Sequence, residues 1–327
     1  MRCFVTGGAG YIGSAVAAEL LAQGHEVTVY DSLVTGHRAA VPSGATFVRG
    51  ELLDQEALSA ALGKKKYDAV LHFAAFIEAG ESMLNPGKYF RNNLEASAQL
   101  IEAVHRADIK RFVLSSTAAL YQTSEEALQE DSPLGPQNTY GHTKLMIEQV
   151  LASYLQIYGL RYAALRYFNA AGALPDRGEA HQPESHLIPL TLRVALGQRE
   201  SVAIFGSDYP TPDGTCIRDY IHIADLVSAH LLALTRLDKD DQLVYNIGSG
   251  HGYSVLEVIE MARRVSGHPI PSIETPRRVG DPARLVASPA RIQQELGWSA
   301  RHSSLEEIIT TAWEWHRKHP NGYAENK

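Results

Sequence analysis

The sequence has few cysteines and no long hydrophobic run. Only Cys3 and Cys216 occur among its 327 residues, which is too few for a disulfide framework or a cysteine metal site, so we expect a reducing compartment. No apolar stretch is long enough to span a bilayer, and a strand begins at once, which leaves no room for a signal peptide. We therefore expect a cytoplasmic protein with no membrane partner.

The charge distribution argues against a nucleic-acid-binding protein, and the spacing of the histidines argues against a metalloprotein. The net charge is −7 and no long basic run occurs, so we expect no nucleic-acid partner. The 14 histidines are scattered without HxxxH or HExxH spacing, and we predict no metal site. A hydrophobic content of 45% is ample for a large folded core.

The N-terminal segment has the pattern of a dinucleotide-binding turn. A short apolar run leads into Gly7, Gly10 and Gly13, and a helical pattern follows. Such glycines permit a tight turn and let backbone N–H groups approach a pyrophosphate at the helix N-terminus. The next strand, 26–30, ends in Asp31. An acid at this position accepts hydrogen bonds from an adenosine ribose and favours NAD over NADP.

Strands and helices alternate through the first half of the chain. This alternation predicts an α/β, Rossmann-type, doubly wound parallel sheet, with ligands beyond the carboxyl ends of the strands. The predicted strands lie near 45–48, 68–72, 111–115 and 162–166, and the predicted helices near 55–62, 87–107 and 139–158.

The pattern changes after Asn169 to a smaller C-terminal lobe. The later elements are a strand at 243–247 and helices near 187–196, 224–237, 255–266, 289–296 and 303–318. We expect a dinucleotide-binding domain at 1–169, with segments near 224–250 returning to it, and a lobe at 170–327 that mainly binds substrate.

Tyr140 and Lys144 form the most informative pair for chemistry. Four residues apart on a predicted helix, they share one face. An ammonium beside a phenol favours the phenolate, so we expect Lys144 to lower the pKa of Tyr140 and make it a base. Thr117 closes a strand that runs toward the glycine turn, and its hydroxyl is suited to relay the proton. With a nicotinamide cofactor, these groups predict hydride transfer at a carbon bearing a hydroxyl.

These motifs occur in a recognisable order along nearly the whole chain. They resemble the extended short-chain dehydrogenase/reductases, and among them the UDP-hexose 4-epimerase family. The segments that carry the resemblance are Gly7–Gly13, Ser115–Thr117, Tyr140 with Lys144, Arg166–Asn169, 203–215, Arg218–His222 and 313–316.

The resemblance implies reversible C4 epimerisation of UDP-glucose and UDP-galactose. Tyr140 would deprotonate the sugar 4-hydroxyl with Thr117 as relay, and hydride would pass to NAD. The 4-keto sugar would then rotate to present its other face, and hydride would return to that face. It assigns NAD to Gly7, Gly10, Tyr11, Ile12, Gly13, Asp31, Ser32, Glu51, Leu52, Phe73, Ala74, Ala75, Asn92, Ser115, Tyr140, Lys144 and Tyr167. It assigns the substrate to Thr117, Tyr140, Asn169, His186, Leu187, Ala203, Phe205, Arg218, Tyr220, Arg278, Asp281 and Leu285.

Several positions depart from that pattern. Glu51 stands where an Asp is frequent, Ile77 replaces a lysine near the cofactor diphosphate, and Ser185-His186 replaces an Asn pair. Leu285 matches a sugar-pocket gatekeeper, at which Tyr goes with rejecting N-acetylated sugars and small residues go with accepting them.

Three alternatives stay open at different strengths. Ala118-Ala119 follow Thr117 where 4,6-dehydratases have Asp-Glu, which argues against that chemistry. UDP-GlcNAc/UDP-GalNAc or UDP-pentose epimerisation is an alternative substrate assignment. A non-catalytic sensor of NAD or nucleotide sugars is disfavoured because Tyr140, Lys144 and Thr117 are all present. The resemblance also implies a homodimer through helices 87–107 and 139–158.

Overall fold

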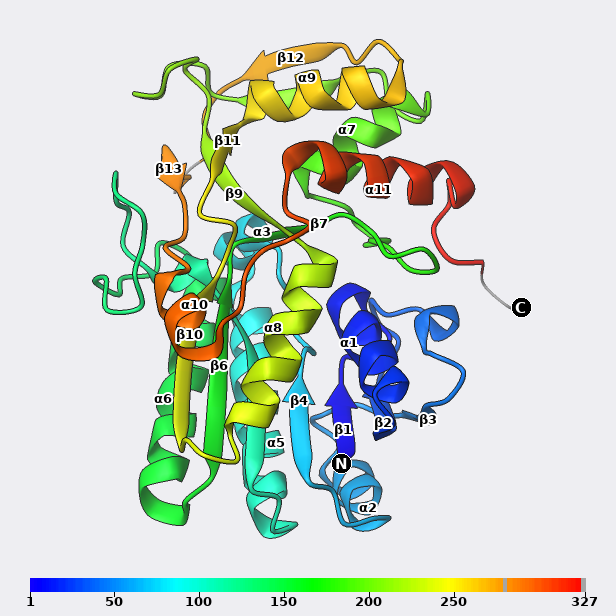
Figure 1. Ribbon diagram of the computed structural model, residues 1–327, viewed down its shortest axis with the longest axis vertical. Coiled ribbons are helices and arrows are strands. Elements are labelled where there is room, and N and C mark those ends of the chain that lie inside the picture. Colours follow the sequence, from blue (N-terminus) through cyan, green and yellow to red (C-terminus); the bar gives the residue numbers. More distant parts are fainter. Residues whose placement is uncertain (279–280, 325–327) are drawn as a thin grey trace.

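A seven-stranded sheet forms the centre of the protein. The computed structural model describes residues 1–278 and 281–324. The strand order is β10-β6-β5-β4-β1-β2-β3, and every neighbouring pair is parallel (Figure 1). The strands are β1 (Arg2–Thr6), β2 (Glu26–Asp31), β3 (Thr46–Arg49), β4 (Ala69–His72), β5 (Arg111–Thr117), β6 (Arg161–Tyr167) and β10 (Gln242–Ile247). The order reverses between β1 and β4, and a parallel sheet binds its ligand at such a switch point.

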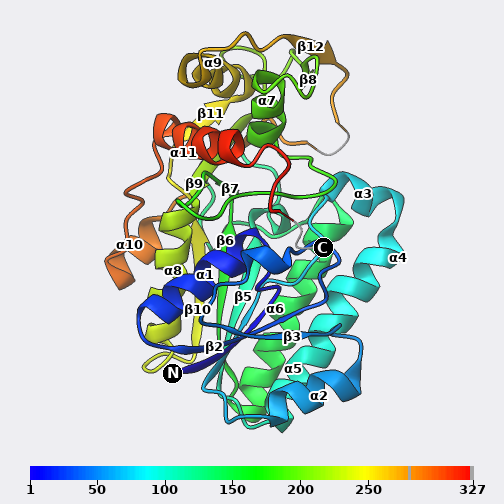
Figure 2. The same cartoon turned by 90° about the vertical axis from the view of Figure 1, so that its right-hand side faces the viewer.

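Helices cover both faces of this sheet. Helices α1 (Tyr11–Ala22) and α8 (Ile223–Arg236) pack on one face, and α2 (Gln55–Gly63), α5 (Ala96–Arg106) and α6 (Thr139–Tyr158) pack on the other (Figures 1 and 2). Alternate residues of β1 enter opposite cores, with Val5 on the α1 side and Phe4 on the α5 side. The period of two along a strand thus produces two apolar cores from one sheet. The predicted fold class is confirmed.

The helix expected at 87–107 is interrupted. Its first turn, α4 (Pro86–Tyr89), passes into a π-helical stretch, η2 (Phe90–Glu95), before α5 begins. The inserted turn places Asn93 in the core, where its side chain bonds Phe76 N and Phe76 O, both at 2.9 Å. A π turn often marks a functional site, and side-chain periodicity alone does not reveal it.

The second lobe lies beyond the carboxyl ends of the strands, at the top of Figure 1. One small sheet contains β7 (Asn169–Ala171), β9 (Ile217–His222), β11 (Gly252–Ser254) and β13 (Arg284–Leu285), and another pairs β8 (Val202–Phe205) with β12 (Ser272–Thr275). Helices α7 (Leu187–Ala195), α9 (Val255–Ser266) and α11 (Leu305–Lys318) share the apolar core of this lobe.

Four short elements complete the description, namely η1 (Arg38–Ala40), α3 (Ala79–Leu84), η3 (Ala118–Leu120) and α10 (Ala290–Leu296). The strand predicted at 243–247 is β10, which pairs with β6 in the main sheet. The chain enters the second lobe at Asn169 through β7, which pairs with β9. In the described part of the chain, no helix has the length and apolar character needed to cross a membrane.

Candidate active site

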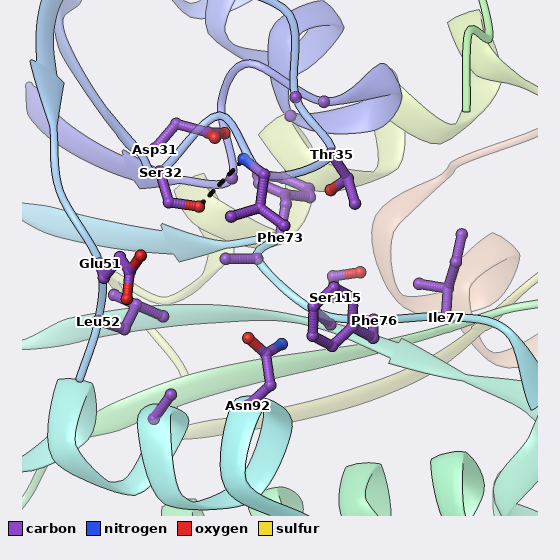
Figure 3. A pocket seen from close by; sticks show the side chains of 18 of the residues that line it. Asp31, Ser32, Thr35, Glu51, Leu52, Phe73, Phe76, Ile77, Asn92 and Ser115 are labelled. Atoms are coloured by element: carbon purple, nitrogen blue, oxygen red, sulfur yellow. Dashed lines mark hydrogen bonds between the residues drawn. The ribbon is translucent and has the colours of Figure 1, made fainter. Parts of the chain in front are cut away.

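A deep cleft opens at the switch point of the sheet (Figure 3). The cleft is open to solvent, and the empty space within it, counting that solvent, is about 1280 Å³. Most of the predicted cofactor residues line it: Gly7, Gly10, Tyr11, Ile12, Gly13, Asp31, Ser32, Glu51, Leu52, Phe73, Ala74, Ala75, Asn92 and Ser115.

The glycine turn is shaped by close backbone contacts. Gly7 has φ of +71°, and a Cβ there would lie 2.4 Å from Ala74 N. A Cβ on Gly13 would lie 2.3 Å from Gly7 O. Helix α1 follows directly, and no side chain caps it at Gly10. Its first N–H groups are therefore left for a ligand, as at other phosphate-binding helix N-termini.

Asp31 ends β2 with its carboxylate fixed in place. One oxygen accepts from Ala9 N at 2.9 Å and the other from Leu33 N at 2.8 Å. Burial raises the pKa of Asp31, while these two backbone bonds oppose the rise. Because a carboxylate oxygen accepts more than one hydrogen bond, Asp31 retains acceptor capacity on the cleft side, next to Ser32 (Figure 3).

The opposite wall is formed by Glu51, Leu52 and Asn92 (Figure 3). Glu51 is exposed, and its backbone oxygen accepts from the Tyr30 hydroxyl at 3.0 Å. The longer acid at this position thus still reaches the cleft wall. Ile77 also lines the cleft and adds an apolar side chain to it.

Sequence reasoning missed several lining residues. They are Tyr30, Val34, Thr35, Gly36, Gly50, Leu53, Phe76, Glu78, Ala96 and His181. Some had a usable signal: Ala96 lies one helical turn after Asn92, and Tyr30 directly precedes Asp31. His181 lies far along the chain from every other lining residue, and no local pattern indicates it.

Tyr140 and Lys144 both lie in the first turns of α6, beside the end of β5. Asn138 caps this helix by accepting from Gly141 N at 2.8 Å. Lys144 is 1% exposed, and its ammonium donates to Ser115 O at 2.7 Å. Burial lowers the pKa of Lys144 to about 8, and the nearby Glu148 carboxylate opposes that shift.

The pKa of Tyr140 differs from the sequence-based expectation. Burial raises it to about 12, a hydrogen bond with Thr117 lowers it, and the Glu78 charge raises it. Lys144 is not among these causes, so the expected pull toward neutrality by the lysine is wrong for the protein alone. Desolvation of a buried phenol outweighs a cation whose own charge is engaged elsewhere.

A buried ion pair fixes α6 against the sheet. Glu148, one turn beyond Lys144, accepts from Arg166 on β6 at 2.7 and 3.1 Å. The two side chains are 8% and 6% exposed, and Ser116 on β5 also donates to Glu148. Three elements that carry predicted site residues are thereby joined at one point.

The end of β5 supplies Ser115 and Thr117. The Thr117 hydroxyl accepts from Ala119 N at 3.1 Å, and Thr117 is 8% exposed. Tyr167 on β6 lies in the sheet core instead, where its hydroxyl contacts the His230 ring. Tyr140, Lys144 and Tyr167 are not among the described residues that line the cleft.

The predicted substrate residues of the second lobe fall into two main groups. The first surrounds β9 and β13, which run parallel with Leu285 opposite Arg218. Arg218 donates to Pro282 O at 2.8 Å and lies 3.7 Å from the Asp281 carboxylate. Leu285 packs against a buried cluster that contains Ala118. The lobe therefore reaches the segment that follows Thr117.

The second group lies on β8 and its neighbours. The Arg278 guanidinium stacks 3.8 Å above the Phe205 ring, and Ala203 lies two residues before Phe205 on the same strand. Two further residues are differently placed. Tyr220 is 5% exposed, and Asn169 donates its amide to Asp219 O at 2.8 Å.

His186 and Leu187 lie at the start of α7, where Leu187 is the first helical residue. The His186 ring contacts the carboxylates of Glu179 and Glu184, each at 2.8 Å. Its side chain is thus engaged by two acids. The acids lie two and seven residues away, a spacing that sequence reasoning did not examine.

The fold and this arrangement define a class. Residues 3–248 match the model of the NAD dependent epimerase/dehydratase family, and the chain belongs to that family, as its motifs predicted. Within it, the chain is 50% identical to the UDP-glucose 4-epimerase of Halalkalibacterium halodurans, over 100% of this chain and 99% of the relative. It is 49% identical to the UDP-glucose 4-epimerase of Streptomyces lividans, over 98% of both chains.

A solved structure shares the whole architecture. The UDP-glucose 4-epimerase from Brucella ovis, in complex with NAD, superposes with a TM-score of 0.92 at 43% identity, covering 96% of this chain and 97% of that one.

Proposed function

We propose that this protein catalyses the NAD-dependent interconversion of UDP-glucose and UDP-galactose at C4. The observation that carries the proposal is the meeting of two features at the carboxyl ends of β1, β4 and β5. One is the cleft beside the glycine turn with Asp31 on its wall, and the other is the helix start that bears Tyr140 and Lys144. The relatives named UDP-glucose 4-epimerase support the choice of sugar.

The cleft residues fit a dinucleotide. The N-terminus of α1 suits the pyrophosphate, Asp31 suits the adenosine ribose, and the Glu51–Leu52 wall suits the adenine edge. When bound, NAD supplies a hydride acceptor and donor, and its positive charge favours an anionic phenol nearby. We propose that Lys144 binds the hydroxyls of the nicotinamide ribose, because Ser115 O holds its ammonium at the end of β5.

Tyr140 is proposed as the general base for the sugar 4-hydroxyl. Its pKa in the protein alone, about 12 with the Thr117 bond already lowering it, is too high for a base at neutral pH. Thr117 is therefore assigned a proton relay between the sugar oxygen and the phenol. Cofactor charge and substrate binding must supply the rest of the shift. When the keto group is reduced again, Tyr140 returns the proton.

The second lobe is proposed to hold the UDP. Arg218 suits the diphosphate because a guanidinium binds phosphate through two parallel hydrogen bonds. Phe205 suits the uracil ring, Arg278 suits a phosphate group, and Asp281 suits the ribose. We assign the remaining substrate contacts to Asn169, Leu187, Ala203 and Tyr220. His186 contributes through its backbone, since its ring is engaged by Glu179 and Glu184.

We accordingly divide the chain into a NAD-binding unit, 1–169 together with 224–250, and a UDP-sugar lobe formed by most of 170–327. Firm UDP binding in the lobe leaves the hexose as the mobile part, and a 4-keto sugar that turns about its bond to the diphosphate presents its other face. Leu285 sits where the lobe meets the segment after Thr117, so it is our candidate for the residue that limits sugar size.

The direct test is a product assay without added reductant. Purified protein should convert UDP-galactose to UDP-glucose and the reverse, and a Thr117→Val and Tyr140→Phe double variant should not. If UDP-galactose is left unchanged while UDP-GlcNAc or a UDP-pentose is epimerised, the reaction class stands and the sugar assignment fails. If NAD binds and no UDP-sugar reacts, the sensor alternative is correct.

We also propose that the protein is a homodimer that pairs α5 and α6 with the same helices of a second copy. Helix α6 carries exposed Met146, Ile157 and Tyr158, which are 36%, 67% and 49% exposed. Light scattering of the wild type should give twice the chain mass, and Ile157→Glu should shift it to the monomer. A monomeric wild type would overturn this.

A further inference from the structure

A second cluster of chemically active side chains lies apart from the catalytic pair. Glu179, His181, Glu184 and His186 come from one eight-residue stretch of the loop before α7, and their candidate ligand atoms all lie within 4.8 Å of one another. We propose that these four side chains bind a divalent transition-metal ion of the Zn²⁺ class. The inference departs from the sequence-based expectation of no metal, and it does not depend on the proposed catalytic function.

The donor atoms already converge on a common centre. Glu179 Oε1 lies 3.0 Å from His181 Nδ1 and 2.8 Å from His186 Nδ1, and Glu184 Oε1 lies 2.8 Å from His186 Nδ1. Donors around a tetrahedral zinc with bonds of about 2.0–2.1 Å are about 3.3 Å apart. The three short contacts would each widen by a few tenths of an ångström around the ion, and the remaining pairs already lie within 4.8 Å.

Burial makes this cluster unlike an ordinary surface group of charges. The Glu179 side chain is 6% exposed and the Glu184 side chain is 0% exposed. Two buried carboxylates side by side repel each other and lack water, so they need a positive partner. A divalent cation bound among the four side chains would neutralise both acids at one point.

Glu184 carries the second, independent observation. Its Oε1 accepts from Ser185 N and His186 N at 2.8 and 2.9 Å, while its Oε2 is buried with no hydrogen-bond partner among the described residues. A fully buried carboxylate oxygen without a partner is costly. A cation that takes Oε2 of Glu184 as its single ligand atom from this residue would satisfy this acceptor.

The donor set indicates which ions fit. Two imidazole nitrogens and two carboxylates match Zn²⁺, which takes four such ligands in closed sites. Hard cations such as Mg²⁺ and Ca²⁺ prefer oxygen ligands alone. Because the four protein ligands fill a tetrahedral shell, we assign the ion a structural role, with no open position for chemistry.

The location explains what the ion would stabilise. Several contacts attach the loop to the cofactor side: Tyr11 donates to Gly172 O at 2.6 Å, His37 contacts Ala180 O at 2.8 Å, and Arg177 donates to Ala40 O at 3.1 Å. His181 lines the dinucleotide cleft, and His186 directly precedes the first residue of α7 in the second lobe. An ion held by both histidines would join the cleft wall to the lobe.

Isothermal titration with ZnCl₂ tests this directly, using full-length holoenzyme freed of metal by EDTA. We expect one Zn²⁺ per chain in the wild type and at least tenfold weaker binding in Glu179→Gln and His181→Ala. His302→Ala is the matched control, because it removes a histidine that also pairs with a glutamate, Glu307, at 2.7 Å but belongs to no cluster of three or more such ligands within the described chain. This control should bind zinc like the wild type.

Two results would overturn the proposal: no stoichiometric zinc uptake by the wild type, or unchanged affinity in Glu179→Gln. Should the variants fail to fold by circular dichroism, wild-type crystals grown with Zn²⁺ decide the matter. Anomalous scattering at the zinc edge should give a peak among the four side chains, and a peak elsewhere alone refutes the site.

Discussion

At the scale of single residues, the site depends on how burial balances charge. Tyr140 and Lys144 were predicted as a phenol activated by its neighbouring ammonium. In the folded protein, burial acts on both groups in opposite directions, with a pKa of about 12 for the phenol and about 8 for the ammonium. The group that favours the phenolate is the Thr117 hydroxyl.

Replacing Tyr140 by Phe should abolish turnover and spare the fold. The variant lacks only the hydroxyl, so kcat for UDP-galactose should fall by about 10²–10⁴-fold, the usual contribution of general acid–base catalysis. NAD content and the melting temperature should change little. Tyr245→Phe is the control, since it removes a phenol bonded to Glu295 at 2.7 Å, away from the site. Equal activity of Tyr140→Phe and the wild type would contradict the role.

Thr117→Val should change the pH dependence as well as the rate. Removing a hydrogen bond that lowers the pKa of Tyr140 raises that pKa, so less phenolate is present at any given pH. The acidic limb of the kcat profile should therefore move to higher pH, and if the pKa rises by about one pH unit the rate at pH 7 should fall about tenfold. Thr117→Ser keeps the hydroxyl and should keep the wild-type limb. An unmoved limb in Thr117→Val would show that the Thr117 hydroxyl does not lower the pKa of Tyr140.

At the scale of elements, α6 is the component that the site relies on. Its bounds, 139–158, were predicted in full from the sequence, and its start is fixed by the Asn138 cap. Its orientation is set by Glu148, which reaches Arg166 on β6 and Ser116 on β5. A tertiary contact of this kind has no local signature.

Glu148→Gln should destabilise the protein strongly. The substitution leaves the buried Arg166 guanidinium without its carboxylate, and breaking a buried pair by removing one partner costs about 3–5 kcal/mol. Urea unfolding of the two proteins measures this difference.

Glu102→Gln is the comparison, because its pair with Arg106, at 2.6 Å, is 32% and 67% exposed. Exposed pairs contribute about 0–1 kcal/mol. Similar unfolding free energies for the two variants would show that the Glu148–Arg166 pair does not secure α6.

At the scale of the whole molecule, sugar choice depends on how the two lobes meet. Leu285 comes from the second lobe, yet it packs with Ala118 and Leu120, which follow β5. Leu285→Tyr should reduce any turnover of UDP-GlcNAc by about tenfold or more and leave UDP-galactose turnover within about threefold, since a larger side chain narrows the space for the N-acetyl group. Steady-state assays with both sugars measure the ratio, and Leu285→Met is the control of similar volume. An unchanged ratio would remove Leu285 as the gatekeeper.

The sequence by itself determined the fold class, the family and most of the dinucleotide cleft. These follow from local patterns: glycine spacing, an acid at the end of a strand, and the period of alternating elements. Gly7 is an example. Its positive φ and its close approach to Ala74 both require glycine, so the glycine spacing alone is enough to predict the turn.

Only the tertiary structure decided the rest. Four properties depend on partners distant in the chain. They are the π turn that carries Asn92, the pKa of Tyr140, the contact between Tyr167 and His230, and the position of His181 in the cleft wall. Burial and long-range contacts set these properties. A pattern along the chain identifies which residues are present, whereas desolvation and partner geometry arise only when the two lobes and the sheet are assembled.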